Sequence, residues 1–225
     1  MYELVSGPLA WLSFGIFLIG CIVRIVLYVK GLDWKLDRVT YSVNVSYGIK
    51  GALRSIGFWI FPFGTQSWRN NPFLTILVFG FHIGLLVTPI FLIGHNVLLF
   101  ERWGISLWTM PEALADILTL LVMVSALFLL LRRLALPEVR ILTDGMDYLV
   151  LLIAVMPFFT GYMAHIQASS YSFWIVCHIL SGEVMLVAIP FTKLSHFVNF
   201  FLSRAQLGMD FGIKRGGMKN KGMVW

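Results

Sequence analysis

Five apolar runs, each long enough to cross a bilayer, limit the folds open to this chain. They lie at 8–29, 73–100, 113–131, 147–165 and 173–201. A membrane helix needs about 20 mainly apolar residues, because it crosses a hydrocarbon core about 30 Å thick with its backbone polar groups bonded internally. Only 12% of the 225 residues are charged, about half the share of a soluble domain. The sequence therefore predicts an all-α integral membrane bundle of five transmembrane helices.

The basic residues predict the orientation of the bundle. Every Lys and Arg except Arg102 falls on one side of the expected topology. Because Lys and Arg accumulate in cytoplasmic loops, the N-terminus is expected outside and the C-terminus in the cytoplasm. We expect a single membrane domain over 1–225, with a cytoplasmic loop 31–72 and a cytoplasmic tail 202–225. This topology explains the pI of about 9.5 without a nucleic-acid partner.

Three local features complete the outline. The first run is too long for the apolar core of a signal peptide and is expected to remain as a helix. Within the long loop, "KGALRSIGFWIFPFG" combines basic and aromatic residues, which is typical of an amphipathic segment at a membrane interface. Cys21 and Cys177 are isolated within spans, so they cannot form an iron–sulfur or zinc site.

The histidines are the residues in these spans most suited to chemistry. All five lie in a span or at its end: His82, His95, His165, His178 and His196. A single membrane histidine is commonly a hydrogen-bond partner between helices, but two runs carry two each, and polar residues in a bilayer usually mark function. On one helix, the 18 residues from His178 to His196 make five turns, about 27 Å, on one face.

Antiparallel packing of the second and fifth runs would bring these histidines together in two pairs. His95 would lie level with His178 near the outer surface, and His82 with His196 near the cytoplasm. Facing imidazoles on neighbouring helices suit a haem with two axial histidines.

The 13 residues between His82 and His95 span about 20 Å, and on an ideal helix they would turn the two side chains about 140° apart. Pro89 and Pro190 predict kinks that would bring the histidines into line.

Two segments resemble the ligand helices of the gamma subunit of respiratory nitrate reductase, a five-span dihaem cytochrome b: "FHIGLLVTPIFLIGH" and "CHILSGEVMLVAIPFTKLSH". They are still more similar to the small cytochrome b subunit of the transmembrane redox complexes of sulfate-reducing bacteria, namely the high-molecular-weight cytochrome c complex and the tetrahaem cytochrome c3 complex. The opening "SGPLAWLSFGIFLIGCIVRIV" resembles that group too. The 18-residue spacing is similar to that in the nitrate reductase subunit, whereas the 13-residue spacing is longer.

The resemblance implies two non-covalent haems b, with axial ligands His82, His95, His178 and His196, and menaquinone as a candidate reactant. The chain would be an electron-transfer subunit in a bacterial cytoplasmic (inner) membrane. Its partners would be a periplasmic multihaem cytochrome c, other membrane subunits and a cytoplasmic iron–sulfur subunit similar to heterodisulfide reductase. The alternatives are a transporter with a histidine proton relay, and a plain membrane anchor subunit without haem.

Other residues are weaker candidates. His165 and Glu183 are candidates for a quinone site. His165 could instead be an interfacial histidine or replace His178 or His95 as a ligand, and Glu183 could bond to a neighbouring helix. Four bases are candidate partners of haem propionates, the first three for the inner haem and the last for the outer: Arg54, Arg69, Lys193 and Arg102. Each could equally be a base that extends from the membrane interface to water.

Overall fold

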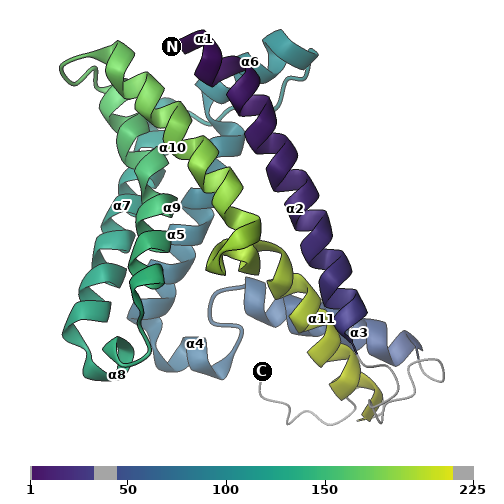
Figure 1. Ribbon diagram of the computed structural model, residues 1–225. Helices are drawn as coiled ribbons and strands as arrows, with labels where there is room; N and C mark the ends of the chain where they lie inside the picture. Colours follow the sequence, from purple (N-terminus) through teal and green to yellow (C-terminus); the bar gives the residue numbers. More distant parts are fainter. Residues whose placement is uncertain (1, 33–44, 215–225) are drawn as a thin grey trace. The chain divides into compact units, whose positions relative to one another are not determined.

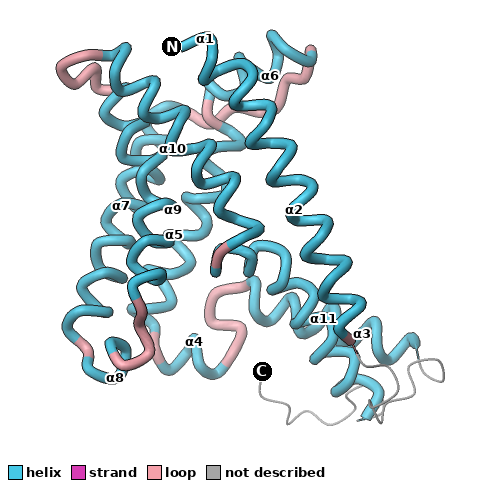
Figure 2. Tube along the Cα trace, viewed as in Figure 1, coloured by secondary structure: helices cyan, strands magenta, loops and turns pink. Residues whose placement is uncertain are grey.

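The computed structural model describes residues 2–32 and 45–214, and this part of the chain consists of helices and loops without a strand (Figures 1 and 2). A π-helical stretch, η1, and a short 3₁₀ helix, η2, accompany the α-helices. The elements in chain order are α1 (Tyr2–Leu4), η1 (Val5–Leu9), α2 (Ala10–Gly31), α3 (Val45–Ile60), α4 (Gln66–Asn70), α5 (Pro72–Phe91), α6 (Ile93–Trp103), α7 (Glu112–Ala135), α8 (Pro137–Arg140), α9 (Gly145–His165), α10 (Tyr171–Phe191), η2 (Lys193–Ser195) and α11 (His196–Lys214).

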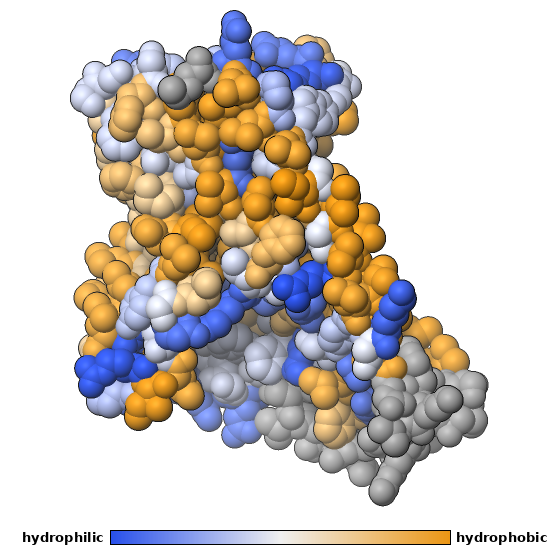
Figure 3. All heavy atoms as spheres, in the orientation of Figure 1, coloured by the Kyte–Doolittle hydropathy of each residue, from blue (hydrophilic) through white to orange (hydrophobic). Residues whose placement is uncertain are grey.

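Within the described ranges, five helical segments are long and apolar enough to cross a membrane: Tyr2–Gly31, Pro72–Phe91, Glu112–Ala135, Gly145–His165 and Tyr171–Phe191. Their outer surfaces carry large apolar side chains, such as Ile19 of α2 at 65% exposure, and Figure 3 shows such residues over much of the visible face. A surface of this kind is stable in lipid rather than in water. The chain is thus an all-α, multi-pass membrane protein, as the sequence predicts.

Two of the five helices end earlier than predicted. The second run was expected to be helical over 73–100 and the fifth over 173–201, but α5 ends at Phe91 and α10 at Phe191. Each end lies one or two residues after a proline. Proline has no backbone N–H to donate, and its ring crowds the preceding turn. The prediction that each run forms one kinked helix is therefore wrong.

The chain divides into two compact units. The first contains the residues up to Ser13 together with Ile76–Leu186, and the second contains Phe14–Thr75 and the residues from Val187 onward. Helices α2, α5 and α10 each contribute to both units. The expected single domain over 1–225 stays a prediction.

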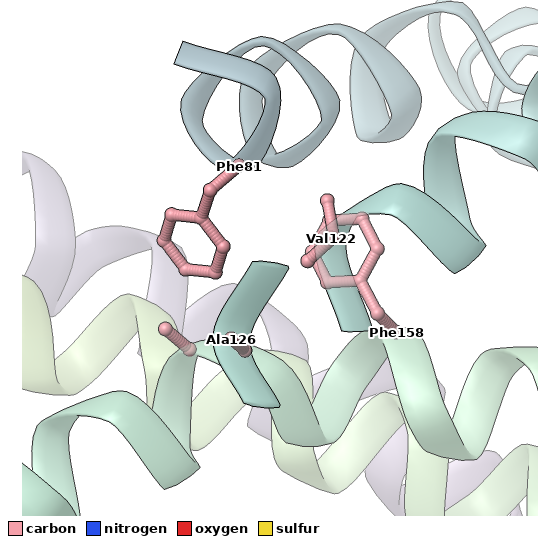
Figure 4. Close-up of a cluster of buried hydrophobic side chains, with 5 residues drawn as sticks. Phe81, Val122, Ala126 and Phe158 are labelled. Carbon is pink, nitrogen blue, oxygen red and sulfur yellow. The ribbon is translucent and has the colours of Figure 1, made fainter. Parts of the chain in front are cut away.

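The core of the first unit lies where α5, α7 and α9 meet. Figure 4 shows side chains from these helices around one apolar cluster; its buried members are Phe81, Val122, Ala126, Ala154 and Phe158. Gly84 permits the close approach of α5 to α7, because a Cβ there would lie only 2.5 Å from Val122 Cγ2. The helix packing therefore depends on small residues, as is common in membrane proteins.

In the second unit, α3 and α11 pack backbone to backbone. A Cβ on Gly51 would overlap the carbonyl of Gly208, and one on Gly212 would overlap the carbonyl of Tyr47. The long loop thus contains a helix that is held against the chain's last described helix.

The side of α3 away from this contact is amphipathic. Its exposed residues include the apolar Ile49 and Leu53 next to the basic Lys50 and Arg54. This agrees with the predicted character of the segment, while its place at the membrane interface stays a prediction. The tail expected at 202–225 begins within α11, and 215–225 lie outside the described residues.

Candidate functional site

His82 and His95 lie on different helices. Pro89 is inside the last turn of α5, Leu92 is extended (φ −68°, ψ 134°), and α6 starts at the next residue. The 13-residue spacing is therefore not a helical repeat, and the 140° divergence expected on an ideal helix does not arise.

Side chains supply hydrogen-bond donors to the carbonyls that this break releases. His95 Nδ1 bonds to Pro89 O at 2.8 Å, and Asn96 Nδ2 donates to Ile90 O at 2.9 Å. Asn96 is only 5% exposed, and its Oδ1 accepts from Leu107 N at 3.2 Å. Because buried polar groups are costly when unpaired, these bonds stabilise the break and fix the position of His95.

His196 also lies beyond a break. After Phe191 the backbone is extended at Thr192 (φ −119°, ψ −171°), whose hydroxyl accepts from Leu194 N at 3.2 Å. His196 is the first residue of α11. The prediction that His178 and His196 share one helix face, five turns apart, is therefore wrong, because the helix that would join them stops after Pro190.

The four predicted ligands share one hydrogen-bonding pattern. Each uses Nδ1 to contact a backbone carbonyl: His82 with Val78 at 2.7 Å, and His95 with Pro89, His178 with Pro157 and His196 with Lys193, each at 2.8 Å. A carbonyl oxygen can only accept, so Nδ1 carries the proton and the lone pair is on Nε2. This is the arrangement that orients a histidine to bind a metal through Nε2.

The structure brings His95 and His178 together. Their ring centroids are 5.8 Å apart, and the ring planes differ by 16°. Two imidazoles that bind one metal from opposite sides would have ring centroids about 6 Å apart, because each metal–nitrogen bond is about 2 Å long and each centroid lies half a ring further out. The separation of the two rings is therefore compatible with a haem held between them, and the haem itself stays a prediction. No cluster of three or more His, Cys, Asp or Glu suited to a metal ion occurs in the described residues, but a haem needs only two protein ligands.

His82 and His196 belong to different units. His82 is half-buried in the first unit, with its ring edge-on to Phe81 at 5.4 Å between centroids. His196 is exposed in the second unit. The inner pair stays a prediction.

Helix α9 orients the His178 ring through two residues that were not predicted from the sequence. Pro157 supplies the carbonyl bonded to Nδ1, and Gly161, one turn later, leaves room for the ring. A Cβ on Gly161 would lie 2.8 Å from His178 Nδ1 and 2.9 Å from its Cε1. The signal was present in "MPFFTGYMAH", as a proline followed by a glycine one turn later within a span.

Substitution of Gly161 by alanine is expected to displace the His178 ring. The new methyl group occupies space taken by the ring, so the haem predicted between His95 and His178 should shift in midpoint potential or be lost, while the other predicted haem remains. Potentiometric titration of the purified protein measures this. Gly145→Ala, in the same helix but with no described atom near its Cβ, is the matched control. Two unchanged haems in Gly161→Ala would show that Gly161 does not position the His178 ring.

Glu183 is a buried carboxyl group in α10, five residues after His178. It is 7% exposed, and neither carboxyl oxygen has a hydrogen-bond partner among the residues that the structure describes. Along an ideal helix it lies about 7 Å from His178. Buried polar groups are nearly always bonded, so the unpartnered carboxyl keeps Glu183 a candidate for proton transfer or ligand binding, and that role stays a prediction.

His165 lies at the end of α9 beside two acidic residues of α7. Its Nε2 is 3.4 Å from Asp116 Oδ1 and 3.7 Å from Glu112 Oε1, and its side chain is 42% exposed. Exposed pairs of this kind contribute little to stability. The structure thus places His165 at a polar helix end, and its role near a quinone stays a prediction.

The four candidate propionate partners lie in different surroundings. Arg54 lies over the Phe58 ring at 5.3 Å, and Arg69 donates to the Phe63 carbonyl at 3.2 Å. Lys193 opens η2. Arg102 shares α6 with His95, two turns away, and donates to the Ser6 carbonyl at 2.9 Å.

Comparison with known proteins places the chain in a family. A protein of Nitratidesulfovibrio vulgaris (strain Hildenborough), described only as "Protein", is 49% identical over 217 residues, which cover 96% of each chain. The chain belongs to the same family as this protein. No protein-family model and no solved structure matches it.

Proposed function

We propose that this chain is a dihaem cytochrome b subunit of a bacterial cytoplasmic membrane. It conducts electrons across the bilayer between a periplasmic cytochrome c or a quinol and a cytoplasmic iron–sulfur protein. The proposal is supported by five helices that are long and apolar enough to cross a membrane. It is also supported by four histidines, within two of these helices or just beyond their ends, that each bond Nδ1 to a backbone carbonyl. The resemblance of the histidine segments to dihaem cytochromes b supports the same reading.

One observation carries the proposal. His95 and His178 come from different helices, their rings are 5.8 Å apart, and both Nδ1 atoms are bonded to proline carbonyls. Two histidines that met by chance would not need both rings anchored at Nδ1. The arrangement supports one haem between them, and the same Nδ1 pattern at His82 and His196 supports a second.

The residues of the chain have separate tasks in this function. A haem, when bound, supplies one-electron redox chemistry. The histidines hold it and set its depth, the apolar helices exclude water, and Glu183 is placed to accept a proton released by a quinol. The basic, amphipathic face of α3 offers a surface for the cytoplasmic partner.

The direct test is a reduced-minus-oxidised absorption spectrum of the purified chain, with extraction of the haem. The proposal expects a b-type spectrum and two haems per chain. A colourless protein would overturn it and would favour a transporter or a plain membrane anchor instead.

Topology gives a second test. A reporter that is active only in the cytoplasm is expected to work when fused after Trp225 and to fail when inserted near Arg102, because the basic residues concentrate on the side of the C-terminus. A reporter active only in the periplasm should show the opposite pattern. Reversal of both results would invert the orientation and exchange the inner and outer haems.

A further inference from the structure

The helix break that precedes His196 leaves the buried carbonyl group of Pro190 without its usual helical donor. Pro190 is among the most deeply buried side chains. In an unbroken helix its carbonyl would accept from the N–H of Leu194, four residues later, but Leu194 N donates to Thr192 Oγ1 instead. A buried carbonyl without a donor destabilises a fold, so this position requires a donor from elsewhere.

Arg24 is that donor. Its Nε lies 2.6 Å from Pro190 O, although the two residues are 166 positions apart in the sequence. Arg24 is half-buried inside the first membrane span. Arginine is rare in such segments, and where it occurs it usually has a specific partner. The guanidinium group thus replaces the backbone donor that the break removes.

The face of α2 around Arg24 fits the break. One turn earlier, Gly20 lies against the proline ring, and a Cβ there would be 2.6 Å from Pro190 Cβ. One turn later, the Tyr28 hydroxyl donates to Gln206 Oε1 on α11. Residues four apart share a helix face, so one stripe of α2 contacts both the end of α10 and the helix that follows.

This stripe also reaches the neighbour of His196. The ring of Phe17 is 6.0 Å from the ring of Phe197, the residue directly after His196. Because Phe17, Arg24 and Tyr28 contact both sides of the break, they define the direction in which α11 leaves α10. His196 is the first residue of α11, so its position depends on that direction.

We propose that Arg24 is a positioning residue for the haem bound by His196: its hydrogen bond to the Pro190 carbonyl holds the α10–α11 break in the geometry that presents the imidazole. This inference rests on the proposed function. It differs from a propionate contact because the group that matters is the Nε–H donor, not the positive charge.

Three variants separate the donor from the charge. Arg24→Leu removes both. Arg24→Gln removes the charge but keeps an N–H donor at the same position along the side chain as Nε. Lys30→Gln removes a charge from the last turn of the same helix and serves as the control. Haem content, difference spectra and midpoint potentials are measured on each purified full-length protein, with His196→Ala as the reference for loss of that haem.

The expected result is selective. Arg24→Leu should lose half of the haem and match His196→Ala, whereas Arg24→Gln and Lys30→Gln should keep both haems with spectra like those of the wild type. Retention of both haems with unchanged potentials in Arg24→Leu, or loss of both together, overturns the inference. If Arg24→Leu does not accumulate, Arg24→Gln decides: a normal His196-dependent signal supports the donor role, and its loss overturns it. A wild-type chain without haem overturns the proposed function instead.

Discussion

Alanine at His95 or at His178 is expected to remove the same haem. A haem that loses one of its two axial imidazoles is expected to dissociate. The haem content of the purified chain should therefore fall by about half. His82→Ala and His196→Ala should remove the other haem. Difference spectra and potentiometric titration would then sort the four variants into two classes, because each haem depends on both ligands of its own pair.

His165→Ala is the control for these substitutions, because it removes an imidazole that pairs with acidic residues at a helix end. It should retain both haems. If His82 and His178 fell into one class, the antiparallel pairing would be wrong. If His165→Ala removed a haem and one of the four other variants did not, the ligand set itself would be wrong.

Glu183→Gln is expected to slow quinol-driven reduction of the haems by about 10²-fold, the lower end of the contribution of a general base. Quinol oxidation releases protons with the electrons, and Glu183 is the buried, unpartnered carboxyl on the helix of His178. Glutamine has nearly the same shape but cannot accept the proton. Stopped-flow reduction by a quinol analogue measures the rate.

The controls for this prediction separate chemistry from folding. Dithionite supplies electrons without a quinol, so it should reduce the haems of Glu183→Gln as fully as those of the wild type. Glu138→Gln, an exposed carboxylate on α8, should leave the quinol-driven rate unchanged. A normal rate in Glu183→Gln would make the residue structural and would remove the best candidate for a quinone site.

The sequence by itself determined the five membrane helices and identified the candidate haem ligands. Long apolar runs admit few folds, because lipid offers no hydrogen bonds to an open backbone. The ends of α7 and α9 lie close to those predicted for the third and fourth runs, since charged and polar residues mark them in the sequence.

The effect of each proline could not be predicted from the sequence. Pro157 lies inside α9, which continues for eight more residues, whereas α5 and α10 stop soon after Pro89 and Pro190. All three prolines remove a backbone donor, and a break is stable only where other groups bond the released carbonyls. Asn96 and Arg24 bond these carbonyls, and only the folded chain brings the two side chains close enough to do so.

The histidines show the same division between what the sequence predicts and what the tertiary structure decides. Their spacing along two runs suggested ligand pairs, but the spacing was interpreted on continuous helices that the fold does not form. The closeness of the His95 and His178 rings depends on the break after Pro89, the Pro157 carbonyl and the space over Gly161. Sequence thus determined which side chains can bind, because residue chemistry is local. Tertiary structure decided which of them meet, because the donors and the space that orient each imidazole come from distant parts of the chain.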